Sequence, residues 1–168
     1  MEATIQTPAM RFRFRPLRWR DAVTIARWHY DGSYAFYDMS LAVLLGVVAV
    51  QWVLRSLGLI TFCAVYADRD EREQLVGVFS FLRHSNALEI GLGLQPDLTG
   101  QGIGLTFVQA GLDYARVYFA PKRFQLVVAA FNTRAITVYE RAGFVPVRHF
   151  TDYHRGRPYA AILMERDA

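Results

Sequence analysis

The stretch that decides the fold is Thr99-Gly100-Gln101-Gly102-Ile103-Gly104, which joins an apolar run at residues 90–94 to a helix-like stretch at 105–119. Its glycines at alternate positions remove side chains where a strand turns into a helix. Such a loop exposes backbone N–H groups beside a helix N-terminus, where they can hold an anionic phosphate. The sequence therefore predicts an anion-binding loop between a strand and a helix.

A dinucleotide-binding loop is the alternative interpretation of these glycines. That loop needs the pattern G-x-G-x-x-G in a short strand–helix–strand unit, with an acidic residue about 20 positions later. Here Gly100, Gly102 and Gly104 are spaced by two, which disfavours the dinucleotide loop.

Composition indicates one globular domain with a proper core, since the chain has 168 residues, of which 53% are hydrophobic and 20% charged. The formal net charge is +4. Much of the excess lies near the start, where arginines alternate with phenylalanines over residues 11–15. A basic excess can serve a nucleic acid or a polyphosphate ligand. The alternation fits an edge strand with one solvated face, and we expect no nucleic-acid partner.

A reducing, cytoplasmic location is expected from the single cysteine, Cys63, which lies in an apolar strand-like run and excludes an internal disulfide framework. Residues 1–10 are predicted to be an N-terminal tail without the apolar core of a signal peptide. Residues 11–168 are predicted to form a single domain.

Residues 41–57 are almost wholly apolar and predict a helix. Gln51, Arg55 and Ser56 interrupt the run, which is shorter than the roughly 20 residues that cross hydrocarbon, so we expect no membrane span. A helix that is apolar on all sides is usually buried in a core or an oligomer interface. A homodimer contact, an acceptor pocket and a membrane contact remain alternatives for this segment.

The predicted element order is strand, two helices, three meandering strands, helix, strand, helix and two strands. This order predicts an α/β (α+β) domain with a mixed, mostly antiparallel sheet flanked by helices. The expected strands are 11–18, 59–67, 75–83, 88–94, 124–130, 144–150 and 159–165, and the expected helices 22–29, 41–57, 105–119 and 133–142. Asp21 is the expected N-cap of the first helix, and residues 68–74 an exposed hairpin turn.

A second motif lies at residues 132–144, in which Asn132, Ala135, Tyr139 and Gly143-Phe144 are spaced over a predicted helix and its end. With the glycine loop before it, this motif makes the chain resemble the GNAT superfamily of N-acetyltransferases over roughly residues 12–164. One departure is Thr99, which stands where the family usually carries Arg or Gln. Thr99 cannot form an ion pair with a phosphate as Arg does, although the backbone donors of the loop remain.

The resemblance implies acetyl-CoA as co-substrate, with its pyrophosphate at the glycine loop and its pantetheine arm along the preceding strand. Asn132 is implied to bond the amide arm of the cofactor, although an ordinary helix N-cap would look the same in the sequence. The implied cofactor-binding residues are Leu92, Gly93, Leu94, Thr99, Gly100, Gln101, Gly102, Ile103, Gly104 and Asn132.

Tyr139 is implied to protonate the departing thiolate of coenzyme A, for which a phenol has a suitable pKa. Glu89 is the first candidate for the general base, and His84 is the second. Simple alternation would place Glu89 on one face with the glycines of the same strand. The aromatic segment that contains Tyr30, Tyr34 and Tyr37 lies where the family builds its acceptor site, and these residues are candidates for lining it.

The resemblance implies direct attack of an amine on the thioester while both substrates are bound. The acceptor is a protein or peptide amine or a small-molecule amine, and the apolar acceptor side favours a peptide or a less polar amine. A non-catalytic module that binds or senses acyl-CoA is the alternative. The histidines have no metal-like spacing, and we expect no metal.

Overall fold

The computed structural model describes residues 3–6, 10–69 and 72–168, and its elements follow the predicted order with one strand added at the start. The strands are β1 (Ala3–Gln6), β2 (Arg11–Pro16), β3 (Ile60–Arg69), β4 (Arg72–Arg83), β5 (Leu88–Leu94), β6 (Arg123–Ala129), β7 (Val145–His154) and β8 (Arg157–Asp167). The α-helices are α1 (Trp19–Ile25), α2 (Leu41–Ser56), α3 (Gly104–Phe119) and α4 (Thr133–Arg141), and the 3-10 turns are η1 (Gly32–Tyr37) and η2 (Pro96–Leu98).

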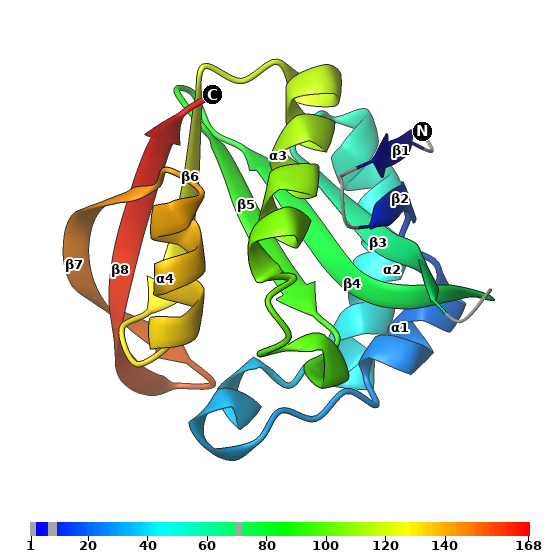
Figure 1. Ribbon diagram of the computed structural model, residues 1–168, viewed down its shortest axis with the longest axis horizontal. Coiled ribbons are helices and arrows are strands. Elements are labelled where there is room, and N and C mark those ends of the chain that lie inside the picture. The colour runs from blue at the N-terminus through cyan, green and yellow to red at the C-terminus, as the bar shows by residue number, and fades with distance from the viewer. Residues whose placement is uncertain (1–2, 7–9, 70–71) are drawn as a thin grey trace.

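The strands form one eight-stranded sheet in the order β1-β2-β3-β4-β5-β6-β8-β7. All neighbouring pairs are antiparallel except β5 with β6, which are parallel. This confirms the predicted mixed, mostly antiparallel sheet. Figure 1 shows α3 and α4 in front of the sheet, and α1 and α2 behind it.

Each face of the sheet has its own core. Phe14, Phe79 and Tyr114 belong to the larger core, in which α3 packs on the strands and the Phe14 and Tyr114 rings stack with their centroids 4.6 Å apart. Ile25 and Leu44 belong to the smaller core, which lies under α1 and α2. Alternate side chains of β3 and β4 therefore enter different cores, which explains why these two strands are apolar on both faces.

The expected N-terminal tail contains β1, so this part of the chain differs from the prediction. β1 pairs antiparallel with β2, with Thr4 opposite Arg13. β2 is consequently an interior strand and not the expected edge strand. Local patterns in residues 3–6 do not predict β1, because its pairing depends on the free backbone edge of β2.

The arginines of β2 meet carboxylates across the sheet. Arg13 donates to Asp68 and Glu73 at 2.8 and 2.7 Å, and Arg15 donates to Glu73 at 2.7 Å. The Arg13 guanidinium lowers the pKa of the Asp68 carboxyl. The arginines of β2 therefore neutralise carboxylates at the adjoining ends of β3 and β4. Where a turn was expected over residues 68–74, the strands continue to Arg69 and resume at Arg72.

The first helix begins earlier than predicted. Arg18 is the N-cap of α1, and Asp21 lies in the first turn, where its Oδ2 accepts the Arg18 N–H at 2.8 Å. Asp21 was expected as the N-cap because a carboxylate suits that position. A carboxylate three residues after the N-cap can also stabilise the helix start, because it accepts the backbone N–H of the N-cap residue.

The apolar helix α2 is continuous over 16 residues. A longer segment, Gly32–Ser56, is long and apolar enough to cross a membrane by length and composition, with a mean hydropathy of 1.7. Its α-helical part rises only about 24 Å, against a hydrocarbon thickness of about 30 Å. Residues between η1 and α2 are extended at Asp38 and Ser40, which breaks the segment. These bounds favour a helix that packs on the sheet.

Candidate active site

The opening between β5 and β6 is the central feature of the site. Parallel pairing between these strands is confined to Leu88 with Phe124 and Glu89 with Gln125. Beyond these pairs the strands diverge, as Figure 1 shows, toward the end where the glycine loop lies. Residues 90–94 consequently present a backbone edge that no neighbouring strand covers, and an extended ligand can bond to such an edge.

The carbonyl of Leu94 points into this opening. The N–H of the next residue, Gln95, donates to the carbonyl of Val76 in β4 at 2.8 Å. The N–H and C=O groups of a trans peptide point in opposite directions, so the Leu94 carbonyl points away from β4. The Tyr30 hydroxyl donates to the Leu94 carbonyl at 2.8 Å from the other side. Burial, with the neighbouring Asp38 carboxylate, raises the pKa of Tyr30 to about 12. Tyr30 is therefore a neutral donor at the opening.

The glycine loop ends at the N-terminus of α3. Gly100 and Gly102 have φ of +76° and +80°, which only glycine adopts without strain, and no atom lies where a Cβ would stand on either residue. Ile103 is the N-cap of α3 and provides no side-chain cap. The first-turn N–H groups of a 16-residue helix are thus left for an anion. This geometry fits a pyrophosphate.

The side chains of the loop bond within it. Thr99 Oγ1 donates to the Pro96 carbonyl at 2.8 Å, and Gln101 Nε2 donates to the Asp97 carbonyl at 2.6 Å. The Thr99 hydroxyl proton is therefore used in the turn, and the backbone N–H groups are the donors that face the loop. The departure at Thr99 leaves this loop without a cationic side chain of its own.

Asn132 and Tyr139 lie on α4, beside the opening. Asn132 is the N-cap of α4, and its Oδ1 accepts the Ala135 N–H at 3.2 Å. The two N–H groups of the Asn132 amide remain for other partners, of which the Tyr37 hydroxyl is one within reach. Burial raises the pKa of Tyr139, and the nearby Tyr37 raises it further. The Tyr139 phenol is consequently protonated well above neutral pH.

Tyr37 lies close to the Asn132 side chain, yet its hydroxyl is buried without a well-formed hydrogen bond among the described residues. Burial raises the pKa of Tyr37, and its neighbours Asn132 and Ala129 partly oppose the rise. A buried hydroxyl without a partner is costly, which makes this group a candidate to bond a ligand. Tyr37 therefore places η1, which contains residues expected to line the acceptor site, next to Asn132, which is expected to contact the cofactor.

Glu89 lies where β5 and β6 begin to diverge. It is half-buried and accepts a hydrogen bond from Gln125 Nε2 at 2.8 Å, while His84 Nε2 lies 3.0 Å from the same carboxylate oxygen. The cross-strand partners of Glu89, Gly91 and Gly93 are Leu82, Ser80 and Val78, at alternate positions of β4, so the three residues share one face as predicted. The two candidate bases of the sequence are therefore in direct contact.

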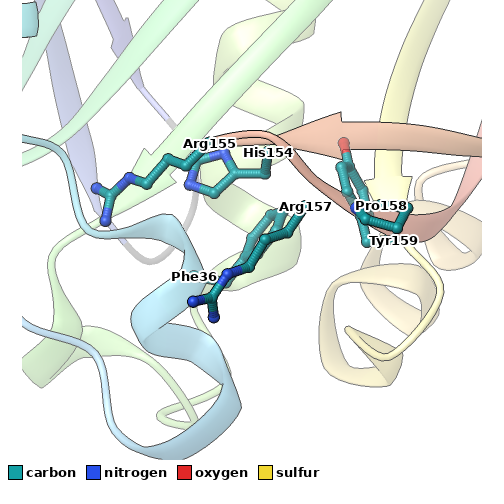
Figure 2. Close-up of a pocket in the computed structure, with 6 residues that line it drawn as sticks. All are labelled: Phe36, His154, Arg155, Arg157, Pro158 and Tyr159. Carbon is teal, nitrogen blue, oxygen red and sulfur yellow. The ribbon is translucent and has the colours of Figure 1, made fainter.

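A cavity of about 520 Å³ lies between η1 and the turn that joins β7 to β8, as Figure 2 shows. His154 Nε2 is buried there without a hydrogen-bond partner among the described residues. The Tyr159 hydroxyl donates to Asp152 at 2.8 Å, and Arg155 donates to the Asp38 carbonyl at 2.9 Å. The residues that line the cavity are Phe36, His154, Arg155, Arg157, Pro158 and Tyr159.

Sequence reasoning missed this cavity because its lining comes from segments more than 100 residues apart. Residues 155–158, Arg-Gly-Arg-Pro, lie between the last two predicted strands, and two arginines beside a turn were the available signal. Phe36 lies within the aromatic segment that the sequence singled out, and its ring packs on His154 with centroids 4.3 Å apart.

A second cavity of about 310 Å³ brings Arg134 to the glycine loop. The Arg134 guanidinium lies 3.8 Å from the centre of the Tyr34 ring, a cation–π contact. Arg134 occupies a position that the α4 motif leaves unspecified, so no pattern in the sequence singled it out. The residues that line this cavity are Tyr30, Asp31, Gly32, Ser33, Tyr34, Pro96, Thr99 and Arg134.

Metal and thiol chemistry have little support in the described residues. No group of three or more metal-ligating side chains occurs within the described ranges. Burial raises the pKa of Cys63 to about 11, so its thiol is protonated. Cys63 contributes to the core and lies away from the opening.

Comparison with known proteins supports the resemblance to GNAT acetyltransferases that the sequence motifs indicate. A sequence model of the acetyltransferase (GNAT) domain matches residues 11–145. A search of curated proteins found no match. Among solved structures, RimJ of Mycobacterium smegmatis in complex with CoA-disulfide superposes with a TM-score of 0.75 at 19% identity, covering 99% of this chain and 87% of that chain.

Two other solved structures are similar over nearly the whole chain. The ribosomal-protein-S5-alanine acetyltransferase of Vibrio fischeri has a TM-score of 0.71 at 20% identity, covering 98% of this chain and 96% of that chain. The spermidine N-acetyltransferase of Vibrio cholerae, in complex with CoA and spermine, has a TM-score of 0.74 at 19% identity, covering 93% and 95%. At these identities the likeness shows the fold. Because the domain model covers most of the sequence, the chain belongs to the GNAT family of acetyltransferases.

Proposed function

We propose that the protein transfers the acetyl group of acetyl-CoA to a primary amine. The observation that carries the proposal is the opening between β5 and β6, with an uncapped helix N-terminus at one end and Tyr139 beside it. Coenzyme A in the Mycobacterium smegmatis and Vibrio cholerae structures is consistent with this co-substrate. We assign its pyrophosphate to residues 99–104, its pantetheine arm to Leu92–Leu94 and its amide contact to Asn132.

The proposed step is a direct acyl transfer. The amine nitrogen attacks the thioester carbonyl carbon, a C–N bond forms and the C–S bond breaks. Tyr139 gives its proton to the departing sulfur, and the excess proton of the amine passes to Glu89, directly or through water. The contact of His84 with Glu89 lets the histidine accept that proton next.

The acceptor side favours an amine that carries an acidic group. Arg155 and Arg157 line the larger cavity, and no carboxylate is among its lining residues. Arg157 has no ion pair among the described residues. A polyamine would meet two guanidinium groups there and be repelled, whereas a peptide with Asp or Glu near its amino group would be attracted. We therefore favour a peptide N-terminus with neighbouring acidic residues over spermidine.

The test of activity combines binding with turnover. Isothermal titration with acetyl-CoA should give a dissociation constant in the micromolar range, and thiol release should then follow addition of an amine. Binding without thiol release for any peptide or small amine would support the non-catalytic sensor instead. The absence of binding at 100 micromolar acetyl-CoA would remove both functions.

The test of acceptor class compares an alanyl-aspartyl peptide, an alanyl-lysyl peptide and spermidine. We expect the aspartyl peptide to be favoured at least tenfold in kcat/KM, and Arg157→Ala to abolish that preference. Arg148→Ala on β7 is the matched control, since its exposed guanidinium lies over Phe150 and not in the cavity. A preference for spermidine would contradict this assignment.

A further inference from the structure

The outward face of α2 is apolar throughout, and no helix or strand among the described residues covers it. Every exposed residue between positions 41 and 53 is apolar, and Leu44 is the buried residue of the helix. Val47 and Val48 pack toward the small core, and Gln51 donates to the Leu17 carbonyl at 2.5 Å, which fixes the opposite face inward. The exposed apolar residues of this α2 face are Leu41, Ala42, Val43, Leu45, Gly46, Ala49, Val50, Trp52 and Val53, with Leu57 just beyond the helix.

The exposed area is large enough for a stable dimer. Trp52 is 81% exposed, Val43 61% and Leu57 64%, and the other large side chains of the face are at least 40% exposed. At roughly 150–250 Å² for a fully exposed large residue, the face presents about 700 Å² of apolar surface. The largest apolar patch of a typical monomer is about 300–600 Å², and a standard interface takes about 800 Å² from each partner. The α2 face therefore has the size of one side of an interface.

The centre line of this face is made of three small residues and one valine. Ala42, Gly46, Ala49 and Val53 recur every three or four positions and so lie in one row on the helix. Trp52 and Leu45 flank the row on one side, and Val43 and Val50 on the other. A row of small residues between larger ones is the shape into which a second helix packs closely.

No contact among the described residues requires a glycine at position 46. Its backbone is helical, and a Cβ placed on it would meet no other atom within 4 Å. Glycine in a helix interior costs about 0.5–1 kcal/mol relative to alanine. Nothing in the fold explains that cost, whereas close approach of a second backbone would.

We propose that α2 forms a homodimer interface, in which two copies of the helix cross at Gly46 about a two-fold axis. A two-fold contact pairs a patch with itself, and a face without charged groups is compatible with its own copy. A membrane surface is less suited to this face, because an interfacial helix carries several Lys or Arg residues on its polar face, and Arg55 is the one basic residue of α2.

The experiment is sedimentation velocity on the full chain between 1 and 100 micromolar. Wild type is expected to be a dimer with a dissociation constant below 10 micromolar. Gly46→Leu should raise that constant at least 100-fold while circular dichroism remains unchanged, since the fold has room for the side chain. Val117→Leu is the matched control, because Val117 is 72% exposed on α3, and should leave the dimer intact.

One further variant and a vesicle assay decide what covers the α2 face. Val53→Glu should give monomers, since a carboxylate would be buried at the same contact. A monomeric wild type at 100 micromolar, or a dimer that survives both Gly46→Leu and Val53→Glu, overturns the proposal. In flotation with phosphatidylcholine–phosphatidylglycerol vesicles we expect no binding. Flotation of wild type that increases in Gly46→Leu would assign the face to a membrane instead.

Discussion

Tyr30 donates its hydroxyl to the backbone carbonyl of Leu94, and this 2.8 Å hydrogen bond joins the segment before η1 to the end of β5, the strand that we propose faces the cofactor. The carbonyl points into the opening between β5 and β6, where no strand supplies a partner. One bond therefore fixes the position of the acceptor segment and satisfies a backbone group at the site.

Tyr30→Phe should lower stability by about 1 kcal/mol, because the Leu94 carbonyl loses its donor while the ring still packs. For a chain of this size we expect the Tm to fall by about 2–4 °C in a thermal melt without cofactor. Tyr153→Phe is the control, since Tyr153 is 67% exposed and should leave the Tm within 1 °C. Equal melting of Tyr30→Phe and wild type would show that the bond contributes nothing.

Tyr139→Phe should lower kcat about 100-fold while the dissociation constant of acetyl-CoA stays within twofold, as expected when a general acid is lost and binding is kept. The phenol must be protonated to act, and burial raises its pKa above the ordinary value. Activity that depends on this proton is therefore present at neutral pH and is lost only as pH rises through the raised pKa.

Stopped-flow thiol release from pH 6 to 10 checks the assignment of Tyr139. An unperturbed phenol titrates near 10, so ionisation of Tyr139 should not lower the kcat of wild type below about pH 10. Any fall in the kcat of wild type in this range should therefore also be seen in Tyr139→Phe. A variant with wild-type kcat across this range would assign the proton to water.

The backbone of the glycine loop and of β5, where we propose that the cofactor binds, was accessible to sequence reasoning because it is built from consecutive residues. The loop at residues 99–104 and the N-cap at Asn132 are local patterns, and β5 has the predicted bounds of Leu88–Leu94. Local patterns report the backbone conformation that they require, such as the positive φ of Gly100. The order of the elements and the mixed sheet followed from the same kind of signal.

The acceptor side was not accessible in that way. His154 and Phe36 are 118 positions apart, and their contact depends on how the β7–β8 turn folds over η1. β1 was missed for a similar reason, since its pairing belongs to β2. The exposure of α2 was also not predicted, because an apolar helix that is buried and one that awaits a partner have the same composition.

Glu89→Gln should lower kcat at least tenfold at pH 7, because the amide cannot take the amine proton that the carboxylate accepts. The hydrogen bonds to Gln125 and His84 hold the carboxylate in place, and Gln can keep one of them with little change in shape. The measurement is kcat against pH with saturating amine and acetyl-CoA.

The control for Glu89 is Gln125→Leu, which removes a donor to the carboxylate and leaves the carboxylate itself. It should change kcat less than threefold. His84→Asn separates the roles of the two contacting groups. If His84→Asn abolishes activity and Glu89→Gln does not, the histidine is the base and the carboxylate orients it.

Arg134 should supply the positive charge that the loop lacks at Thr99. Both residues line the cavity of about 310 Å³ at the loop, and the guanidinium is held over Tyr34. A hydrogen bond to a charged group contributes about 1.5–3 kcal/mol, so Arg134→Ala should raise the KM for acetyl-CoA at least tenfold with kcat nearly unchanged. Arg134→Met keeps the apolar stem and should show the same loss, whereas Arg134→Lys should recover part of it. Arg141→Ala, at the exposed end of the same helix, is the control and should leave KM unchanged.

The difference between wild type and Arg134→Ala should shrink between 0.05 and 0.5 M salt, because salt screens the attraction between the guanidinium and a phosphate. A loss in Arg134→Ala that Arg134→Met fully restores would assign the residue to packing on Tyr34 and leave the pyrophosphate to the backbone of residues 100–104 alone.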